Sequence, residues 1–502
     1  METLQDNIVG SAQVARMPNE YERGAWARMR RVAWAVCWKN PTLTAVVLSV
    51  VCLLVFLAPR GWWNTGTSGD TAPAELLPIA ILKYHALDFD RLIAEHPSVA
   101  NRNDLPYWFT ERNGRVVSFY PIVPGLMNVP TYSIAGWLGY DLFHYRYILS
   151  HITSCVIGAL SAGFMFLALD AICERRVVAI TFTIVFAFGT EVWGTLTEGM
   201  WQHGPSILLL SAAMMILLRR WRWGIPLAGV LLGLAVWNRP TNVLLVAPIA
   251  LYAAFAYRRQ VAAFACAMGV PLMLLAIYSY LYCGSVVYLG QGRSAVEDLS
   301  SANKALTAPL PPGVTGALRG PLGAGVAGLL FSPNRGLFVF APIFAAGFAY
   351  LIYATFSLRE NSIFRCMLAG ILLSLWCYGH WFVWWGGWSW GYRLLSEWIP
   401  FLILASAMSW QRWLSRYRLT RWPFIAVGLW MIYVQTLGAL YFRWNDFNFR
   451  PDNIDKNPAR IWTIQGGEIA RDQKLLWADL KTICSGHLPK MQTPKPIGSN
   501  VK

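Results

Sequence analysis

Charged side chains are scarce in this chain. Asp, Glu, Lys and Arg make up 14% of its 502 residues, whereas soluble domains carry about 25%. Hydrophobic residues make up 56%, and the mean hydropathy is +0.40. Several apolar runs reach about 18 to 22 residues, enough to cross a hydrocarbon core roughly 30 Å thick. This shortage of charge excludes an ordinary soluble domain and predicts a polytopic membrane protein.

Several chemical motifs are also missing. None of the nine cysteines stands in a C-x-x-C pair, which excludes the metal sites that use this spacing. No Rossmann or P-loop signature occurs, as expected if no nucleotide-linked substrate is used. Most cysteines fall inside apolar runs, where they behave as small hydrophobic residues. Only Cys283 and Cys484 are placed to meet on an oxidising side, and the sequence leaves open whether they pair.

The net charge of +16 predicts a topology rather than a nucleic-acid partner, because nothing resembles a nucleic-acid-binding module. Basic residues cluster beside the apolar runs, as they do on the cytoplasmic side of membrane proteins. The clusters lie at 28–39, 175–176, 219–222, 258–259, 359–365 and 412–421. We expect residues 1–40 to stay attached as a cytoplasmic segment, since the charge before the first apolar run is too heavy for a cleaved signal peptide.

Alternation between these clusters predicts an all-α bundle of about eleven transmembrane helices, with the N-terminus inside and the C-terminus outside. The expected spans are 41–58, 148–170, 177–194, 204–218, 224–238, 241–257, 261–283, 337–356, 366–385, 396–411 and 422–443. The transmembrane domain then covers 41–443. It includes a long outer loop (59–147) and a second outer loop (284–336), and a polar tail or small cap follows over 444–502.

Two segments of the first outer loop are expected to lie on the bilayer surface. Residues 73–87 form a helix-like stretch with an apolar face, typical of a juxtamembrane helix. Residues 121–140 are apolar, but prolines interrupt them, and a span there would invert every basic cluster downstream. We therefore predict an interfacial element at 121–140.

Polar residues gather on the outer face in this topology. Ionisable groups at membrane depth are costly and mark functional sites. The seven histidines all fall outside or in the outer part of a helix: His85, His96, His144, His151, His203, His380 and His487. The polar breaks between helices show the same bias. The pattern predicts an open cavity at the outer surface, with the further cavity or acceptor-binding candidates Glu75, Glu191, Glu198, Tyr392 and Glu397.

Asp70 is the first candidate for chemistry. It follows the first span in Thr67-Ser68-Gly69-Asp70-Thr71. One interpretation is that it caps the helix beginning near Pro73, since Asp is a preferred N-cap and Pro suits the first turn. The other is that this carboxylate is a general base for an acceptor hydroxyl.

The outer arginines are the second candidates. Arg239 either satisfies carbonyls freed by Pro240 in the Asn-Arg-Pro break or holds a phosphate. Arg335 and Arg393 lie at helix ends, where snorkelling is the common explanation. Several arginines on the outer side are unexpected under the positive-inside rule. An anionic ligand is the simplest explanation for their position. Glu198 and His203, five residues apart, have no spacing that supports a metal.

The motifs in this order resemble the GT-C superfamily of membrane glycosyltransferases, which use polyprenyl-phosphate sugars. The resemblance covers roughly 41–410. It rests on Ser68-Gly69-Asp70-Thr71, the stretch 73–87, Phe119-Tyr120-Pro121-Ile122-Val123-Pro124-Gly125, Asn238-Arg239-Pro240-Thr241 and Gly387-Trp388-Ser389-Trp390-Gly391-Tyr392-Arg393-Leu394-Leu395. The chain is similar to the aminoarabinose, protein-mannosyl and arabinofuranosyl transferases in having a long first loop with periplasmic juxtamembrane helices.

The resemblance implies that Asp70 is the catalytic carboxylate of a GT-C glycosyltransferase. Aminoarabinose transferases carry Lys-Pro where this chain has Tyr120-Pro121. The lysine's role on the donor phosphate therefore does not transfer, and Lys83, Arg115 or Arg239 are substitutes.

The expected function is inverting transfer of a sugar from a polyprenyl-phosphate donor to a hydroxyl of a glycan, lipid or protein. It would take place at the periplasmic face of a bacterial inner membrane. The sequence assigns no definite cofactor and leaves open whether a divalent cation takes part. A block oligosaccharide transferase or ligase is the nearest alternative. A lipid or sugar transporter or flippase is another, though transporters place polar breaks near the midplane.

Overall fold

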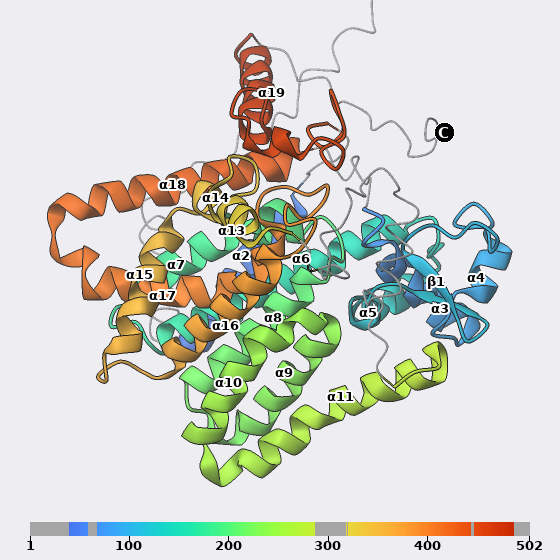
Figure 1. Cartoon of the computed structure of the whole chain (residues 1–502), viewed down its shortest axis with the longest axis horizontal. Helices are drawn as coiled ribbons and strands as arrows, with labels where there is room; N and C mark the ends of the chain where they lie inside the picture. The colour runs from blue at the N-terminus through green and yellow to red at the C-terminus, as the bar shows by residue number, and fades with distance from the viewer. Residues whose placement is uncertain (1–39, 59–67, 287–317, 319, 443–445, 486–502) are drawn as a thin grey trace, which may run out of the picture.

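The computed structural model describes residues 40–58, 68–286, 318, 320–442 and 446–485 (Figure 1). About 71% of it is helical, and the one sheet in the described part is a two-stranded hairpin. The expected all-α class is therefore confirmed.

A helix lies in each of the eleven predicted ranges. The helices of the bundle are α2 (Pro41–Leu57), α6 (Arg146–Asp170), α7 (Arg176–Phe188), α8 (His203–Leu218), α9 (Ile225–Asn238), α10 (Val243–Ala256), α11 (Val261–Cys283), α14 (Leu337–Phe340), α15 (Ile343–Phe356), α16 (Ile363–Gly379), α17 (Ile399–Arg412) and α18 (Arg418–Tyr441). The predicted span 337–356 is divided between α14 and α15. The short helix α13 (Leu322–Phe331) was not predicted.

Three helices of the described chain are long and apolar enough to cross a membrane on their own: Arg146–Asp170, Arg258–Cys283 and Arg418–Tyr441. Seven shorter apolar helices of 10 to 17 residues accompany them. The length and composition of these helices indicate a helical membrane protein. The count of eleven spans stays a prediction.

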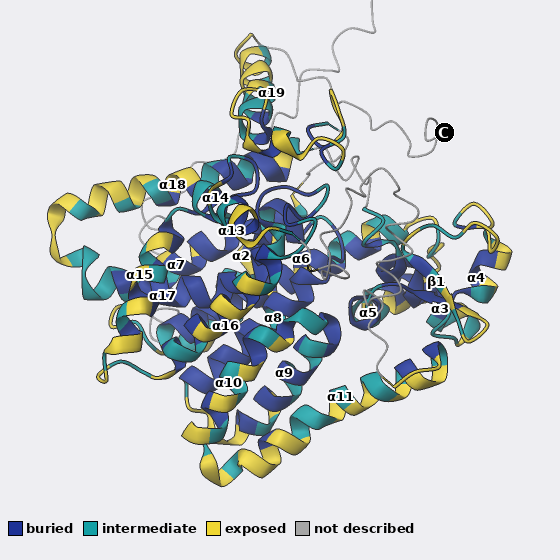
Figure 2. Cartoon of the chain, viewed as in Figure 1, coloured by how far each residue is buried: buried dark blue, intermediate teal, exposed yellow. Residues whose placement is uncertain are grey.

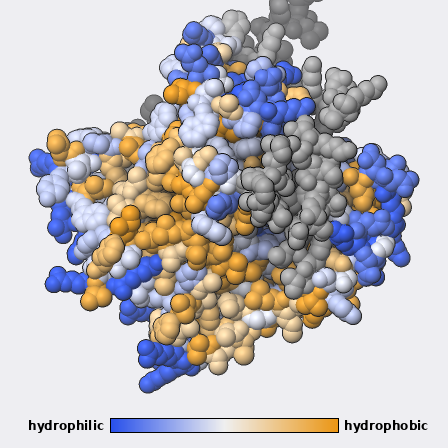
Figure 3. All heavy atoms as spheres, in the orientation of Figure 1, coloured by the Kyte–Doolittle hydropathy of each residue, from blue (hydrophilic) through white to orange (hydrophobic). Residues whose placement is uncertain are grey.

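The bundle is packed inside and apolar outside. Helices that pack against each other include α2 with α6, α9 with α11, α15 with α17 and α10 with α16. Buried residues fill the centre of the bundle (Figure 2). On the face drawn in Figure 3, apolar side chains form a broad area, whereas hydrophilic ones gather at the edges. The exposed apolar side chains on α15 and α16 include Phe356, Leu372 and Trp376. A surface of this kind suits lipid contact.

Residues 68–145, within the predicted first outer loop, fold into a lobe beside the bundle (Figure 1). Its elements are α3 (Ala72–Tyr84), α4 (Asp90–Glu95), β1 (Phe109–Arg112), β2 (Arg115–Ser118) and α5 (Val123–Trp137). Helix α3 matches the predicted stretch 73–87, and α5 occupies 121–140. A separate group of buried side chains forms the lobe's core and includes Trp237 of α9. Trp237 thereby ties the lobe to the bundle.

The hairpin of the lobe was not predicted. Strands β1 and β2 pair antiparallel, with Arg112 opposite Arg115. The turn between them is Asn113-Gly114, and both residues have positive φ (49° and 70°). An Asn-Gly pair favours this type of hairpin turn because both residues tolerate a left-handed backbone.

Residues after α18 form a small cap that ends in α19 (Glu468–Cys484), which stands away from the bundle (Figure 1). The possible disulfide does not form, because Cys283 and Cys484 are both free thiols. They end α11 and α19, which lie in different parts of the molecule.

Helices α9 and α11 pack closely at a glycine, and this generates a stability prediction. A Cβ at Gly229 would collide with the backbone carbonyl of Phe264, and overpacking of this kind costs about 1–3 kcal/mol. We expect Gly229→Ala to lower the free energy of unfolding in detergent by that amount. The matched control is Gly269→Ala, because a Cβ there has no heavy atom within 4 Å. Equal stability of the two variants would contradict the packing described.

Candidate active site

Asp70 lies in a tight turn just before α3. The N-cap of α3 is Thr71, and no side chain caps the helix, so the interpretation of Asp70 as the helix cap is wrong. Gly69 allows the turn to pack against aromatic residues. A Cβ there would lie 2.5 Å from both the Trp108 ring and the Tyr107 hydroxyl. The Ser-Gly-Asp motif thus brings the carboxylate under the hairpin lobe.

The Asp70 carboxylate accepts hydrogen bonds from three groups. Tyr107 and Tyr120 donate to Oδ1 over 2.9 and 2.6 Å, and Arg393 donates to Oδ2 over 2.8 Å. The Asp70 side chain keeps 22% of its surface exposed and that of Arg393 keeps 10%. Residues far apart in the chain therefore converge on one partly accessible carboxylate.

These contacts determine the charge state of Asp70. Burial alone would raise its pKa, but the Arg393 charge and the three hydrogen bonds outweigh burial and lower the pKa below its usual value. Burial and the Asp70 charge raise the pKa of Tyr107 and Tyr120 well above 10. Both phenols are therefore donors at neutral pH. Asp70 stabilises the fold above its unfolded pKa, and this contribution is lost only as pH falls through the lower folded value.

Arg393 is held in place by its own loop. Its guanidinium carbon lies 4.4 Å from the centre of the Trp201 ring, a favourable cation–π distance. It also donates to the carbonyl of Gly386. Gly386 and Gly387 both have positive φ (75° and 69°), which glycine adopts readily. The Gly-Gly pair thus turns this loop back toward the arginine.

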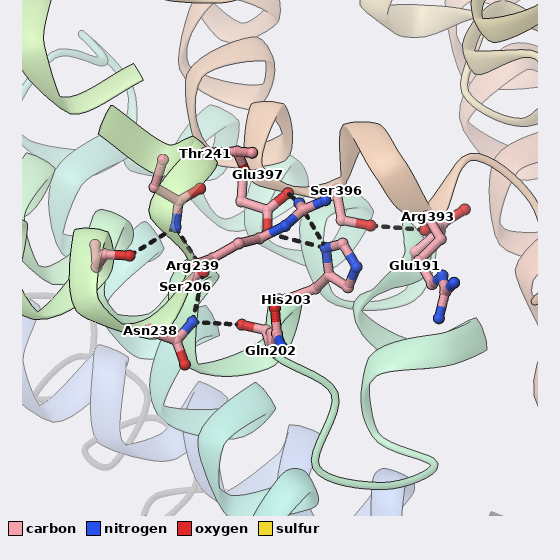
Figure 4. A network of polar contacts seen from close by, with 12 residues as sticks. Glu191, Gln202, His203, Ser206, Asn238, Arg239, Thr241, Arg393, Ser396 and Glu397 are labelled. Carbon is pink, nitrogen blue, oxygen red and sulfur yellow. Dashed lines mark hydrogen bonds and ion pairs between the residues drawn. The ribbon is translucent and has the colours of Figure 1, made fainter. Parts of the chain in front are cut away.

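Arg393 begins η6 (Arg393–Trp398), a short 3-10 helix before α17. Two more of its side chains bind distant segments (Figure 4). Ser396 donates to Glu191 over 2.8 Å, next to the π-helix η1 (Val192–Leu196). Glu397 contacts His203 and Arg239. One turn of helix therefore contacts the Asp70 loop and three segments of the bundle.

Glu397 lies at the centre of a buried charged cluster. Its Oε1 is 2.9 Å from His203 Nδ1, and its Oε2 pairs with Arg239 Nη1. The three side chains are only 1–8% exposed. Arg239 also lies 5.3 Å from the centre of the Tyr378 ring. Arg239 therefore balances the charge of a buried carboxylate, and the described structure gives it no bond to a carbonyl freed by Pro240.

The Asn-Arg-Pro break positions Arg239. Helix α9 ends at Asn238, and Arg239 is extended (φ −150°, ψ 107°), as the residue before a proline prefers. Asn238 donates to the Gln202 carbonyl and to the Ser206 hydroxyl over 2.6 and 2.7 Å (Figure 4). The break is thus tied to the start of α8, where His203 lies.

Arg335 has a different role from the phosphate binding considered from the sequence. It is 1% exposed and forms a 2.7 Å ion pair with Glu468 of α19. It also donates to Asn448 over 2.7 Å and to the Trp385 carbonyl over 3.1 Å. These contacts anchor the cap to the bundle.

The remaining candidates lie outside the Asp70 group. Lys83 pairs with Glu95 on the exposed surface, and Arg115 lies 3.5 Å from Asp88. Glu75 is buried and accepts a hydrogen bond from the Thr71 hydroxyl. Glu198 follows η1, and Tyr392 is buried in the bundle core. Nδ1 of His380 lies 3.2 Å from the Gly320 carbonyl oxygen. Of the five phosphate candidates, only Arg239 and Arg393 join the network around η6.

Sequence reasoning missed several members of the site. Tyr107 and Trp201 carry no motif signal. Tyr120 stands in one of the motifs of the resemblance, but the sequence does not indicate that it binds Asp70. A recess adjoins Tyr120. Its lining residues are Ser118, Phe119, Tyr120, Pro121, Ile122, Trp237, Pro240, Leu275, Tyr278 and Ser279. In the described ranges no three His, Cys, Asp or Glu side chains form a metal-holding group.

The buried ion pair of Arg335 generates a second prediction. Removing one partner of a buried pair costs about 3–5 kcal/mol because a charge is left uncompensated. We expect Arg335→Met to lower the free energy of unfolding by this amount. Arg471→Met is the control, since Arg471 pairs with Asp446 over 2.9 Å at a partly exposed site and should lose about 0–1 kcal/mol. Similar losses for both variants would contradict the anchoring role.

No protein-family model matches this chain, and no curated protein or solved structure does so either. The resemblance drawn from the motifs therefore stays a prediction.

Proposed function

We propose that the protein is a GT-C-like glycosyltransferase. It would transfer a sugar from a polyprenyl-phosphate donor to an acceptor hydroxyl on the periplasmic side of a bacterial inner membrane, with inversion. Asp70 is the proposed general base. The observation that carries the proposal is the convergence of Tyr107, Tyr120 and Arg393 on this carboxylate. No metal is assigned to the step.

The hydrogen bonds and the charge of Asp70 support its proposed role as general base. A carboxylate offers about four acceptor positions, and three donors occupy it here, so one position is left for an acceptor hydroxyl. The lowered pKa keeps it ionised at neutral pH. General-base assistance of this kind contributes about 10²- to 10⁴-fold.

The arginines support a phosphate-linked donor. Arg393 lies directly against Asp70, and its Nη1 donates to that carboxylate over 2.8 Å. A guanidinium binds phosphate oxygens through paired N–H groups. In the proposed reaction Arg393 stabilises charge that develops on the leaving phosphate.

The recess beside Tyr120 supports a lipid-borne donor. Helix α11 forms one of its walls through Leu275 and Tyr278, and only 11% of the apolar window of this helix is buried. Its exposed apolar residues include Met273 and Ile277. In this proposal the lipid chain lies along α11, and the bilayer delivers the donor already oriented toward Asp70.

The test is an assay of Asp70→Asn with radiolabelled polyprenyl-phosphate sugars and membrane extract. The variant keeps the shape of the side chain but cannot take up a proton as a carboxylate does. We expect its transfer rate to fall by at least about 10²-fold.

Asp104→Asn is the matched control, because Asp104 is an exposed carboxylate of the same lobe and should behave as wild type. Full activity of Asp70→Asn would remove Asp70 from the mechanism. If wild type transfers sugar from none of the lipid-linked donors, the proposed function is wrong.

A further inference from the structure

Helix α19 has an apolar side that stays exposed. Trp477, Leu480 and Cys484 are separated by three and four residues, a spacing that places them on one face of a helix. Trp477 is 55% exposed and Leu480 is 39% exposed, and the Cys484 thiol is exposed and free. Ala478, two residues before Leu480, is exposed on nearly the opposite side. Exposed apolar residues gathered on one side of a helix mark a binding surface.

Two lysines border this apolar face. Lys474 precedes Trp477 by three residues and Lys481 follows it by four, so both lie beside it on the helix surface. Both lysines are exposed, and neither forms an ion pair with another residue of the described ranges. Asp479 interacts with Tyr441 of α18 instead. The face is therefore apolar at its centre and positive along its border.

The contact with α18 sets the depth of α19 relative to a membrane. Helix α18 is one of the described helices long and apolar enough to cross a membrane, and its 24 residues span about 36 Å at 1.5 Å per residue. Tyr441 is its last residue and so lies where a membrane-crossing α18 reaches the surface. Helix α19 packs against α18 with Asp479 at Tyr441. The apolar face of α19 is therefore level with the membrane boundary.

The direction of α19 is also fixed. Figure 1 shows α19 running across the direction of α18 instead of continuing it. Its first residue, Glu468, pairs with Arg335 over 2.7 Å, and the Glu468 N–H donates to the Asn334 side chain over 2.7 Å. The exposed apolar residues of α18 include Leu429 and extend to Leu440, next to Tyr441. The apolar face of α19 therefore adjoins the surface that α18 presents to lipid.

We propose that α19 lies on the membrane surface as an interfacial helix that binds phospholipid. Trp477, Leu480 and Cys484 contact the upper part of the acyl chains, and Lys474 and Lys481 bind the headgroup phosphates. A helix with an apolar face, a tryptophan at the boundary and lysines beside it suits this position. The lysine stems can lie along the apolar layer while their ammonium groups stay among the phosphates.

The charge pattern favours lipid over a second copy of the chain. In a symmetric contact the same patch of both copies meets. Because the charged residues that border the patch are both lysines, such a contact would bring positive charges together. Lipid phosphates are negative and complement them. The inference does not depend on the proposed glycosyl transfer, since it concerns only where α19 lies.

The first test measures the depth of a bimane label on Leu480→Cys, in protein that also carries Cys37→Ser, Cys266→Ser and Cys484→Ser. The vesicles contain phosphatidylethanolamine, phosphatidylglycerol and a lipid with a nitroxide near the headgroup end of its acyl chain. We expect at least about twofold stronger quenching than at Ala478→Cys, because the apolar face of an interfacial helix lies about 5–10 Å below the headgroups. Ala478→Cys is the matched control on the opposite side of the helix. Equal quenching at the two positions would overturn the inference.

The native Cys484 thiol provides a second measurement in which α19 is unchanged. Protein with only Cys37→Ser and Cys266→Ser is labelled at Cys484, and we expect the nitroxide lipid to quench this label as strongly as the one at position 480. An unquenched label at Cys484 would overturn the inference even if Leu480→Cys disturbed the helix.

Crosslinking tests the rival occupant directly. The same protein, in vesicles without nitroxide, is treated with a short bis-maleimide that joins nearby thiols. If α19 binds lipid, Cys484 should yield no crosslinked dimer above the level of a Cys484→Ser control. Efficient dimer formation through Cys484, together with an unquenched label, would show that a second copy covers this face and that the lipid contact is wrong.

Discussion

Three side chains of one short helix hold the candidate site together. Arg393, Ser396 and Glu397 of η6 bind the Asp70 turn, the residue before the π-helix η1, the first residue of α8 and the break after α9. Burying charge in a protein is costly unless each charge has a partner. Every segment that supplies a partner is therefore fixed relative to the others, and the outer lobe is fixed to the bundle by the same contacts.

The network also separates two kinds of positive charge. Arg239 is paired within the cluster and lies under an aromatic ring, so its main effect is to permit a buried carboxylate. Arg393 shares its carboxylate with two phenols, and that carboxylate is partly exposed. Arg393 therefore belongs to the accessible Asp70 group, whereas Arg239 belongs to the buried cluster.

The sequence could predict elements whose cause is local. Apolar length and basic clusters predict the helix ranges, and Pro240 predicts the end of α9. The Asn113-Gly114 pair is also a local cause, because this pair favours a hairpin turn. The partnership of Asp70 with Arg393 could not be predicted, because 323 residues separate them. The position of Arg335 at a helix end suggested that it binds an anionic ligand. Only the fold shows that Glu468 neutralises its charge inside the protein.

The anchoring of the cap has a consequence for biosynthesis. Asn448, a hydrogen-bond partner of Arg335, is made 113 residues later, and Glu468, which neutralises its charge, is made later still. At roughly 5–20 residues per second, the guanidinium waits on the order of 10 seconds for it. During this interval the ribosome still holds a partly made bundle in which the charge of Arg335 is not neutralised. A truncated chain without the cap would keep Arg335 without its ion-pair partner. Quality-control proteases could therefore distinguish truncated chains from complete ones at this position.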